Sequence, residues 1–324
     1  MCAVKRLKSL QAEKDIDEIA GCLQLAMLLE VSAYPKPGNI HRAADFEETR
    51  YEHFLASAIG VGPHFREAAR RGVLLGSDRI HGNDVGIGAV IRDAVLDVAK
   101  WQHGGNTSLG SIILLMPIAV AAGSVSRKGM FTIDDLRSSI KTVTDNTTAK
   151  DTLALYESID TAKPGGLGEV PMLDVKKIET KEIIARQNVT ILDVFKIAST
   201  YDSIASEWVN NYHITFDLAY PYFNEQMTLI KDINVATVHT FLKVLSEVPD
   251  TLIARKVGEE KAREVSLEAN RVLREGGLVS SEGKKRLAEF DSSLRTADHK
   301  FNPGTTADLI VAVLAVGLLM GMRP

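Results

Sequence analysis

The chain has 324 residues, 45% of them apolar, and its 38 Lys and Arg against 42 Asp and Glu leave a net charge of −4. Because no block of basic residues stands out, the composition lacks the electrostatic footprint of a nucleic-acid-binding protein, and we expect no nucleic-acid partner. Cys2 and Cys22 are the only cysteines, too few for a disulfide framework or a cysteine-based zinc site, which suits a reducing cytoplasm. The charged N-terminus predicts no secretion signal, and apolar runs of about 13 residues are too short for a membrane span.

Helical periodicity dominates the chain, as where Ile19, Leu23 and Met27 recur on one helix face. Alternating strand patterns are nearly absent. We therefore expect an all-α fold, a single compact multi-helix domain over residues 1–324 with about a dozen helices. The expected helices are 16–32, 51–71, 84–101, 111–122, 133–143, 149–158, 191–208, 217–230, 235–246, 250–274, 281–294 and 305–320.

Three segments interrupt this pattern, 34–48, 160–171 and 298–304, and each contains a Pro-Gly pair that marks a turn. The stretch 160–180 is the expected excursion from the compact domain, because its lysines indicate exposure. These lysines are Lys163, Lys176, Lys177 and Lys181.

Residues 103–110 place small polar side chains directly before the apolar run 111–122. The first N–H groups of a helix have no internal partner and carry partial positive charge, and neighbouring glycines let an anion approach them. This pattern predicts an anion site, with phosphate as the favoured ligand. The alternative is plain capping of a core helix. The predicted contacts are Asn106, Thr107, Ser108 and Gly110.

A second candidate segment follows the first expected helix. Lys36 lies between two prolines in a stiff loop, so it loses little additional entropy on meeting an anion. Gly38 shares this loop, His41 is a candidate acid or base, and Arg42 is a fork-shaped donor for a nucleotide. The alternative is a charged surface loop.

Acidic residues supply candidate ligands for Mg²⁺, which prefers oxygen. Asp45 and Glu48 precede the second expected helix, where acids also simply favour the helix dipole. Asp250 is a candidate ligand of a metal or a ribose hydroxyl, or only a helix N-cap. Thr251 and Lys256 follow it, with Arg255 or Lys256 expected near phosphate.

The last apolar helix begins in a similar way, with Gly304 and Thr305 at its start and Asp308 in its first turn. A carboxylate that enters the core needs a partner, because an unpaired buried charge is costly. A cation, ligand hydroxyls or the helix's own N–H groups would each serve, so Asp308 is both a candidate catalytic residue and a candidate metal ligand.

In their order along the chain, these motifs resemble the triphosphoribosyl-dephospho-coenzyme A synthase family from about residue 20 to residue 320. The residues that carry the resemblance are Glu30, Lys36-Pro37-Gly38, Asn106-Thr107, Gly110, Gly168-Glu169, Asp250-Thr251, Lys256, Gly258, Pro303-Gly304 and Ala307-Asp308-Leu309.

The resemblance implies an all-α, Mg²⁺-dependent pentosyltransferase. Such an enzyme joins the triphosphoribosyl group of ATP to the ribose of 3′-dephospho-coenzyme A and releases adenine. It implies catalytic roles for Glu30, Lys36 and Asp308. A Mg²⁺-dependent all-α hydrolase of a nucleotide or an ADP-ribose-like glycoside, and a non-catalytic nucleotide-binding protein, are the alternatives. Part of the run 309–321 could pack against a second subunit, so a homodimer is a further expectation.

The chain departs from the family pattern in two places. Where the family has His-Lys after Asn-Thr, this chain has Ser108-Leu109, and His41 stands where an Asp is expected after Lys-Pro-Gly. Leu109 cannot hold a phosphate through its side chain. Either Lys36 or Arg42 replaces the missing cation, or the substrate differs.

Overall fold

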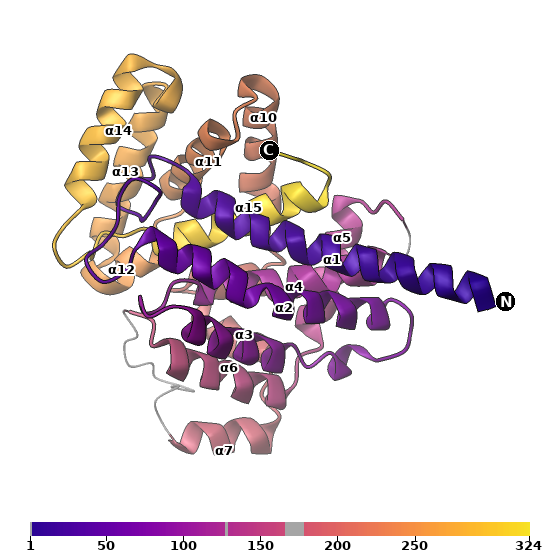
Figure 1. The fold of residues 1–324 in the computed structure, drawn as a ribbon. Coiled ribbons are helices and arrows are strands. Elements are labelled where there is room, and N and C mark those ends of the chain that lie inside the picture. The colour runs from indigo at the N-terminus through magenta and orange to yellow at the C-terminus, as the bar shows by residue number, and fades with distance from the viewer. Residues whose placement is uncertain (1, 127–128, 166–177) are drawn as a thin grey trace.

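The computed structural model describes residues 2–126, 129–165 and 178–324. Within these ranges the chain forms fifteen α-helices, one π-helix and two 3₁₀ turns, and it has no strand beyond an isolated bridge between His41 and Ala44. The all-α prediction is confirmed (Figure 1). The α-helices are α1 (Cys2–Ser32), α2 (Tyr51–Leu75), α3 (Ile87–Trp101), α4 (Leu109–Ser126), α5 (Ile133–Asp145), α6 (Ala149–Ala162), α7 (Ile178–Gln187), α8 (Ile191–Ala198), α9 (Ser203–Val209), α10 (Tyr220–Ile230), α11 (Ile233–Glu247), α12 (Thr251–Val257), α13 (Glu259–Arg274), α14 (Ser281–Leu294) and α15 (Gly304–Leu319).

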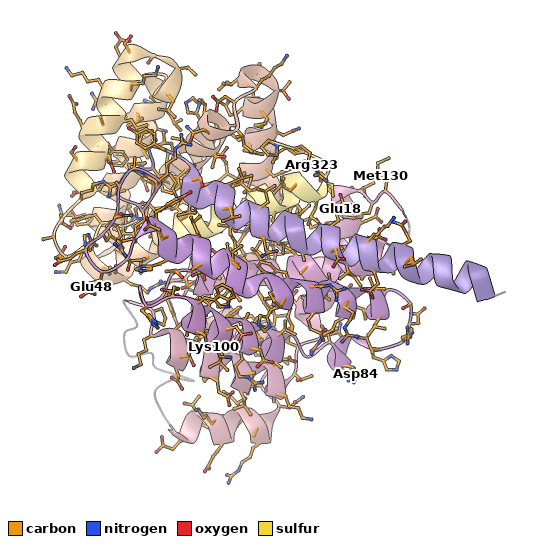
Figure 2. All side chains as sticks on the ribbon, in the orientation of Figure 1. Glu18, Glu48, Asp84, Lys100, Met130 and Arg323 are labelled. Atoms are coloured by element: carbon orange, nitrogen blue, oxygen red, sulfur yellow. The ribbon has the colours of Figure 1, made fainter. Side chains whose placement is uncertain are left out.

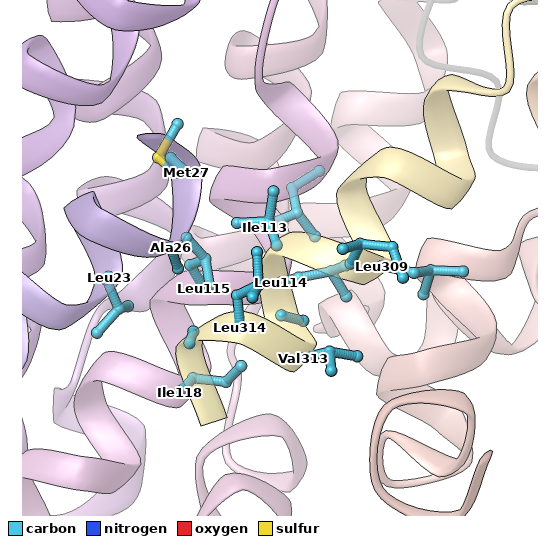
Figure 3. Close-up of a cluster of buried hydrophobic side chains, with 14 of the residues drawn as sticks. Leu23, Ala26, Met27, Ile113, Leu114, Leu115, Ile118, Leu309, Val313 and Leu314 are labelled. Carbon is cyan, nitrogen blue, oxygen red and sulfur yellow. The ribbon is translucent and has the colours of Figure 1, made fainter. Parts of the chain in front are cut away.

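The centre of the molecule is built by α4 and α15, which are apolar on nearly all sides and therefore buried on nearly all sides. Figure 3 shows side chains of these two helices meeting those of α1, with Ala26 close to Leu115 and Leu114 close to Leu314. Among the described helices, α4 alone is long and apolar enough to cross a membrane by length and composition. It is longer than the expected run 111–122, and 83% of its residues are buried inside the molecule, as in a core helix.

Close packing of α2 against α4 depends on glycine. A Cβ atom added to Gly123 of α4 would lie 2.1 Å from the carbonyl oxygen of Ala69, and one added to Gly72 of α2 would lie 2.0 Å from that of Val120. Neither carbonyl can move without moving its helix, so only residues without a side chain fit at this crossing.

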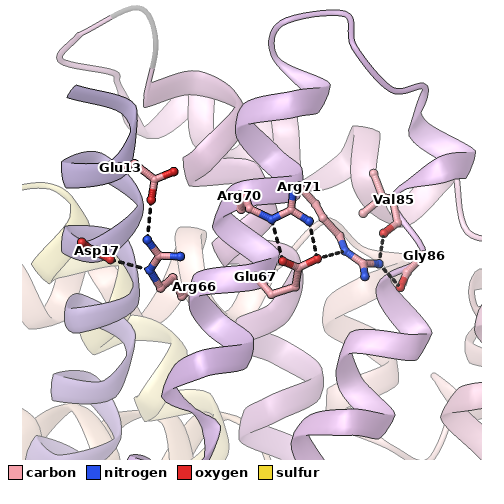
Figure 4. A network of polar contacts seen from close by, with 8 residues as sticks. All are labelled: Glu13, Asp17, Arg66, Glu67, Arg70, Arg71, Val85 and Gly86. Carbon is pink, nitrogen blue, oxygen red and sulfur yellow. Dashed lines mark hydrogen bonds and ion pairs between the residues drawn. The ribbon is translucent and has the colours of Figure 1, made fainter. Parts of the chain in front are cut away.

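Outside the core, charged side chains of α2 connect this helix with α1 and with the turn before α3 (Figure 4). Arg66 of α2 pairs with Glu13 and Asp17 of α1. Arg71 donates to the carbonyl oxygens of Val85 and Gly86, at 2.6 and 3.0 Å. Because the Arg66 pairs are exposed, each contributes little to stability.

The two ends of the chain lie on different sides of the molecule. The N-terminal part of α1 extends past the neighbouring helices (Figure 1). Arg323, next to the C-terminus, pairs with Glu18 of α1 at 2.8 Å, and both residues are labelled in Figure 2. The C-terminal segment is thereby tied to the middle of the first helix.

Two expected helices are each divided in two, and α7 has no counterpart in the sequence prediction. The helix expected over 250–274 breaks at Gly258, whose φ of +97° only glycine adopts readily, which separates α12 from α13. The helix expected over 191–208 breaks before Asp202, whose side chain accepts from the N–H groups of Ile204 and Ala205 and starts α9. Short breaks of this kind reorient the chain, and here both flank the site described below.

Candidate active site

A cavity of about 640 Å³ lies where the ends of several helices meet. Its walls come from the C-terminal part of α1, the loop 39–49, the segment 104–111 that starts α4, the end of α6, helices α8 and α9, helix α12, and the loop that leads into α15. Residues from all three Pro-Gly segments therefore line the cavity, including Pro164-Gly165 of the second segment. Glu169 and Gly168 lie outside the described residues.

The acidic end of the cavity is organised by an ion pair inside the protein. Lys36 is fully buried and its Nζ donates to the Glu30 carboxylate and to Asn39 Oδ1, the latter at 3.1 Å. Asn39 Nδ2 in turn donates to Asn302 Oδ1 at 2.8 Å, which connects the loop after α1 with the loop before α15. Burial raises the pKa of Glu30 and lowers the pKa of Lys36. Glu30 and Asn39 line the cavity, whereas Lys36 lies behind them.

Asp308 is the second carboxylate at this end. Ser111 Oγ of α4 donates to its Oδ1 at 2.5 Å, and a Cβ atom on Gly110 would lie 2.1 Å from its Oδ2. Glycine at position 110 thus leaves room for the carboxylate beside the first turn of α4. Burial, and secondarily the charge of Glu30, raise the pKa of Asp308 to about 7. A carboxyl group with this pKa can exchange a proton near neutral pH.

The first turn of α4 forms the adjoining wall. Asn106 Oδ1 caps the helix by accepting from the N–H of Leu109 at 3.1 Å, and Thr107 Oγ1 bonds Ser57 Oγ at 2.7 Å. Ser108 is 4% exposed, lines the cavity, and its Oγ has no hydrogen-bond partner within the described part of the chain. The helix cap weighed as the alternative is thus present, together with an unpaired hydroxyl at the cavity; the anion site itself stays a prediction.

Basic groups also line the cavity. Arg255 Nη1 pairs with Asp202 at 2.6 Å, and Lys256 Nζ donates to the backbone carbonyl of His299 at 3.4 Å. The His299 ring stacks on Phe46 with 3.9 Å between ring centroids. Burial lowers the pKa of Lys256, because the charged ammonium group loses hydration. An anion bound beside it would compensate for this loss.

Unsatisfied polar atoms are concentrated in this cavity. In the described ranges, five buried side-chain polar atoms have no partner, and three of them belong to cavity-lining residues: Ser108 Oγ, Arg255 Nε and His299 Nδ1. Native proteins seldom leave such atoms unpaired unless a ligand or water completes them. The cavity is therefore built for a polar ligand.

Ten of the predicted site residues line this cavity: Glu30, Glu48, Asn106, Thr107, Ser108, Gly110, Lys256, Gly304, Thr305 and Asp308. They come from segments that are far apart in the sequence.

His41 does not line it. The imidazole is 2% exposed, its Nδ1 faces the N–H of Ala43 at 3.2 Å, and its Nε2 faces Arg295 Nη2 at 3.1 Å. Burial and the Arg295 charge lower the pKa of His41 to about 4. The ring is neutral at pH 7 and is occupied in fixing the loop, so we do not retain it as the acid or base.

Gly38, Arg42 and Asp45 also lie outside the cavity lining. The N–H of Gly38 donates to Asp291 of α14 at 2.8 Å, which docks the loop. Arg42 is exposed and lies over the ring of Tyr34. Asp45 accepts from the first N–H of α2 at 2.8 Å, which is the helix-start role weighed against metal binding.

Asp250 is an internal cap and not an open ligand. One oxygen accepts from the N–H groups of Leu252 and Ile253, at 2.9 and 3.0 Å, and the other accepts from the N–H and Oγ1 of Thr306, at 2.7 and 2.8 Å. Four donors saturate this carboxylate. The neighbouring Thr251 bonds Thr305 Oγ1 at 3.3 Å and is itself outside the lining.

The four expected Mg²⁺ ligands, Asp45, Glu48, Asp250 and Asp308, are not brought together. Among the described residues, no three His, Cys, Asp or Glu side chains lie close enough to hold a metal ion by themselves.

Sequence reasoning assigned no site role to Lys163, Asp202 or His299. Lys163 was expected to be an exposed loop lysine, Asp202 fell inside the helix expected over 191–208, and His299 stood within the segment 298–304 without a distinguishing pattern. All three line the cavity.

The comparisons with known proteins agree with this architecture. Residues 16–323 match the family described as CitG, ATP:dephospho-CoA triphosphoribosyl transferase. A protein of Malonomonas rubra, provisionally named 2-(5″-triphosphoribosyl)-3′-dephosphocoenzyme-A synthase, is 24% identical over 313 residues, covering 93% of this chain and 87% of its own. The Klebsiella pneumoniae protein of the same name is 24% identical over 313 residues, covering 95% of this chain and 91% of its own.

A crystal structure from Archaeoglobus fulgidus, provisionally assigned as a triphosphoribosyl-dephospho-CoA synthase, shares the fold with a TM-score of 0.58. It is 22% identical and covers 83% of this chain and 100% of its own. The family match extends over nearly the whole chain, and the chain belongs to the CitG family of triphosphoribosyl transferases.

Proposed function

We propose that the protein transfers the triphosphoribosyl group of ATP to a ribose hydroxyl of 3′-dephospho-coenzyme A. The bond between adenine and C1′ of ATP breaks, and a bond forms between C1′ and the acceptor oxygen. The hydroxyl proton is lost and the departing adenine gains one, so the products are triphosphoribosyl-dephospho-coenzyme A and free adenine. The family match over residues 16–323 is the observation that carries this proposal.

The charges in the cavity support it. Arg255, Lys256 and Lys163 offer positive charge to phosphates, and the carboxylates of Glu30 and Asp308 line the same cavity. Glycosyl transfer at C1′ passes through an oxocarbenium-like state with positive charge on the ribose. Carboxylates and cations in one cavity suit a substrate whose triphosphate is anionic and whose reacting carbon becomes cationic.

Asp308 is the proposed general base. Its raised pKa makes the carboxylate basic enough to take a hydroxyl proton, and Ser111 holds it in one orientation. Glu30 is the proposed electrostatic partner of the ribose. Lys36 acts through Glu30 and Asn39 as a positioning residue, because its Nζ does not reach the cavity wall.

The cavity also fits Mg²⁺ bound together with the substrate. Mg²⁺ is usually held by one or two carboxylates and by substrate phosphates and not by an all-protein cage. Glu48 lines the same cavity and is the proposed protein ligand, together with the substrate phosphates. Asp308 is kept as the base, because a carboxylate bound to Mg²⁺ would lose the raised pKa on which that role depends. The ion would neutralise triphosphate charge.

Neither residue expected to replace the missing family lysine does so. Lys36 is committed to Glu30, and Arg42 lies outside the cavity lining. Arg255, Lys256 and Lys163 line the cavity instead, and we propose these three as the cations for substrate phosphates.

The test is to incubate the protein with ATP and Mg²⁺, with and without dephospho-coenzyme A, and to measure adenine by chromatography. Adenine is expected only when the acceptor is present, together with an acceptor heavier by one triphosphoribosyl group. Adenine release without an acceptor would support a glycoside hydrolase instead. Binding of ATP without turnover of any acceptor would support a non-catalytic nucleotide-binding protein.

A further inference from the structure

A second cavity of about 340 Å³ adjoins the first. The two cavities share the residues that separate them, Gly105 to Leu109 and Lys163. The remaining walls of the side cavity include the apolar side chains of Val95, Val98 and Ala99 of α3, Ile112 of α4 and Ala162 of α6. The polar residues Gln102, His103 and Thr161 complete them. Both volumes fall within the range of small-molecule sites.

The shared wall has a defined shape. Gln102 is buried, its Oε1 accepts from the N–H of Gly104 at 2.5 Å, and its Nε2 donates to the carbonyl oxygen of Gly105 at 2.9 Å. Gly105 has a φ of +76°, which lets the loop turn back towards α4. The partition between the cavities is thus held by side-chain hydrogen bonds within the loop.

Positive charge and an open hydroxyl meet at the junction. Lys163 lines both cavities, and within the described ranges no carboxylate forms an ion pair with it. Ser108 also lines both cavities and is only 4% exposed. Its Oγ has no hydrogen-bond partner within the described part of the chain. Such a junction suits a phosphate group flanked by two different ligand parts.

We propose that the side cavity holds the pantetheine arm of the acceptor. Its diphosphate then lies at the junction beside Lys163 and Ser108, and its ribose enters the main cavity near Asp308. This inference rests on the proposed function. It assigns to the acceptor a subsite that ATP does not need, because ATP carries no group beyond its triphosphate.

The chemistry of the acceptor matches the order of these surfaces. In dephospho-coenzyme A a diphosphate joins the adenosine ribose to the pantetheine arm. A polar, carboxylate-lined cavity, a cationic junction and an apolar side cavity occur in the same order. The branched carbon chain of the arm would contact Val95, Val98 and Ile112, and its burial supplies affinity roughly in proportion to the apolar area covered.

Ala99 offers a direct test, because it is exposed at the rim of the side cavity and can be enlarged without disturbing the core. Ala99→Phe is compared with Ala288→Phe, an equally exposed alanine on α14 that lines neither cavity. Dissociation constants for dephospho-coenzyme A, ADP and ATP are measured by calorimetry. ADP has the ribose and diphosphate of the acceptor but no pantetheine arm.

Wild-type protein should bind dephospho-coenzyme A more tightly than ADP. Ala99→Phe should weaken dephospho-coenzyme A binding by about tenfold, equivalent to about 1.4 kcal/mol. The same change should alter ADP and ATP binding by less than about twofold, and Ala288→Phe should change none of the three. Lys163→Ala should weaken dephospho-coenzyme A and ADP together, because both place a diphosphate at the junction.

Three results would overturn the inference. If Ala99→Phe binds dephospho-coenzyme A as the wild type does, the arm lies elsewhere, while adenine release by the wild type still supports the proposed function. If Ala99→Phe weakens the binding of ADP and ATP as much as that of dephospho-coenzyme A, the substitution acts on the whole site. Thr161→Phe is then the second test, because Thr161 is exposed on the α6 side of the same cavity. It must weaken dephospho-coenzyme A binding alone, or the proposal fails. If the wild type neither binds nor converts dephospho-coenzyme A, the proposed function and this inference both fail.

Discussion

Asp250 and Asp308 are both buried acids at helix starts, yet their surroundings give them different roles. Asp250 accepts four hydrogen bonds and joins the first turns of α12 and α15. Asp308 takes a hydrogen bond from Ser111, faces the cavity, and has the charge of Glu30 nearby. The first arrangement stabilises the fold, and the second leaves a carboxylate available to a substrate.

Replacing Asp308 by Asn should reveal its raised pKa. The folded protein holds a proton on Asp308 up to about pH 7, whereas the unfolded chain releases it near the ordinary value of 3.8. The folded state therefore binds more protons between these values, and Asp308 lowers stability progressively as pH rises from about 4 to about 7. Relative to wild type, Asp308→Asn should gain roughly 2–4 kcal/mol of unfolding free energy between pH 4 and pH 8.

The same substitution should reduce kcat by about 10²-fold or more if Asp308 is the base, and remove the rise in kcat as pH passes through 7. Urea denaturation across pH and the pH profile of adenine release are the measurements. Asp145→Asn, an exposed carboxylate paired with Lys141, serves as the control. A stability difference that does not change with pH would contradict the assignment.

Asp250→Asn should destabilise the protein and leave the proposed Mg²⁺ dependence of its activity unchanged. Asn has one acceptor oxygen where four donors converge, and its NH₂ group would face N–H groups. The expected loss is about 1–3 kcal/mol of unfolding free energy, measured in urea. Asp232→Asn is the matched control, because Asp232 caps α11 at an exposed position where Asn is an equally good cap. A shifted Mg²⁺ titration with unchanged stability would restore Asp250 as a metal ligand.

At the scale of elements, α4 contributes both to the cavities and to the core, and a different glycine is needed for each role. Its first turn borders both cavities, and its C-terminal half packs closely on α2. A Cβ atom at Gly110 would meet the end of the Asp308 side chain, whereas one at Gly123 would meet the backbone of Ala69. The first obstacle is a side chain that can shift, and the second is a helix that cannot.

Gly110→Ala should therefore reduce activity more than stability, since the Asp308 carboxylate must move to make room. Gly123→Ala should reduce stability by about 1–3 kcal/mol or more while leaving residual activity per folded molecule unchanged. Adenine release and thermal unfolding of the two variants provide the comparison. Equal effects of both variants on activity per folded molecule would show that the position of Asp308 is not what Gly110 protects.

The helices themselves were largely predictable, because helical periodicity and capping act over a few residues. Thr132, Thr148 and Thr190 each accept from the N–H three residues later, as Thr-x-x-Asp sequences predict. The breaks were not predictable: Gly258 interrupts an otherwise continuous helical pattern, and Asp202 starts a new helix within another. A glycine within a helical pattern permits a break without requiring one.

At the scale of the whole molecule, the site is assembled from both halves of the chain. The loop after α1 and the loop before α15 meet through Asn39 and Asn302 at a sequence separation of 263 residues. Asn106 and Asp308 line the same cavity, and their membership of one catalytic site stays a prediction. Homodimer formation, a cytoplasmic location and the absence of nucleic-acid and membrane partners stay predictions.

The sequence by itself determined the all-α class, the helices that form the core and the family, because these depend on local periodicity and on motifs read in order. Only the tertiary structure decided which of the motif side chains line the cavity. Lys36 and Asp250 carry motif signals as strong as those of Glu30 and Asp308, yet internal partners occupy them. Whether a polar side chain meets a ligand or a neighbour depends on the rotation and approach of distant helices, which no local pattern encodes.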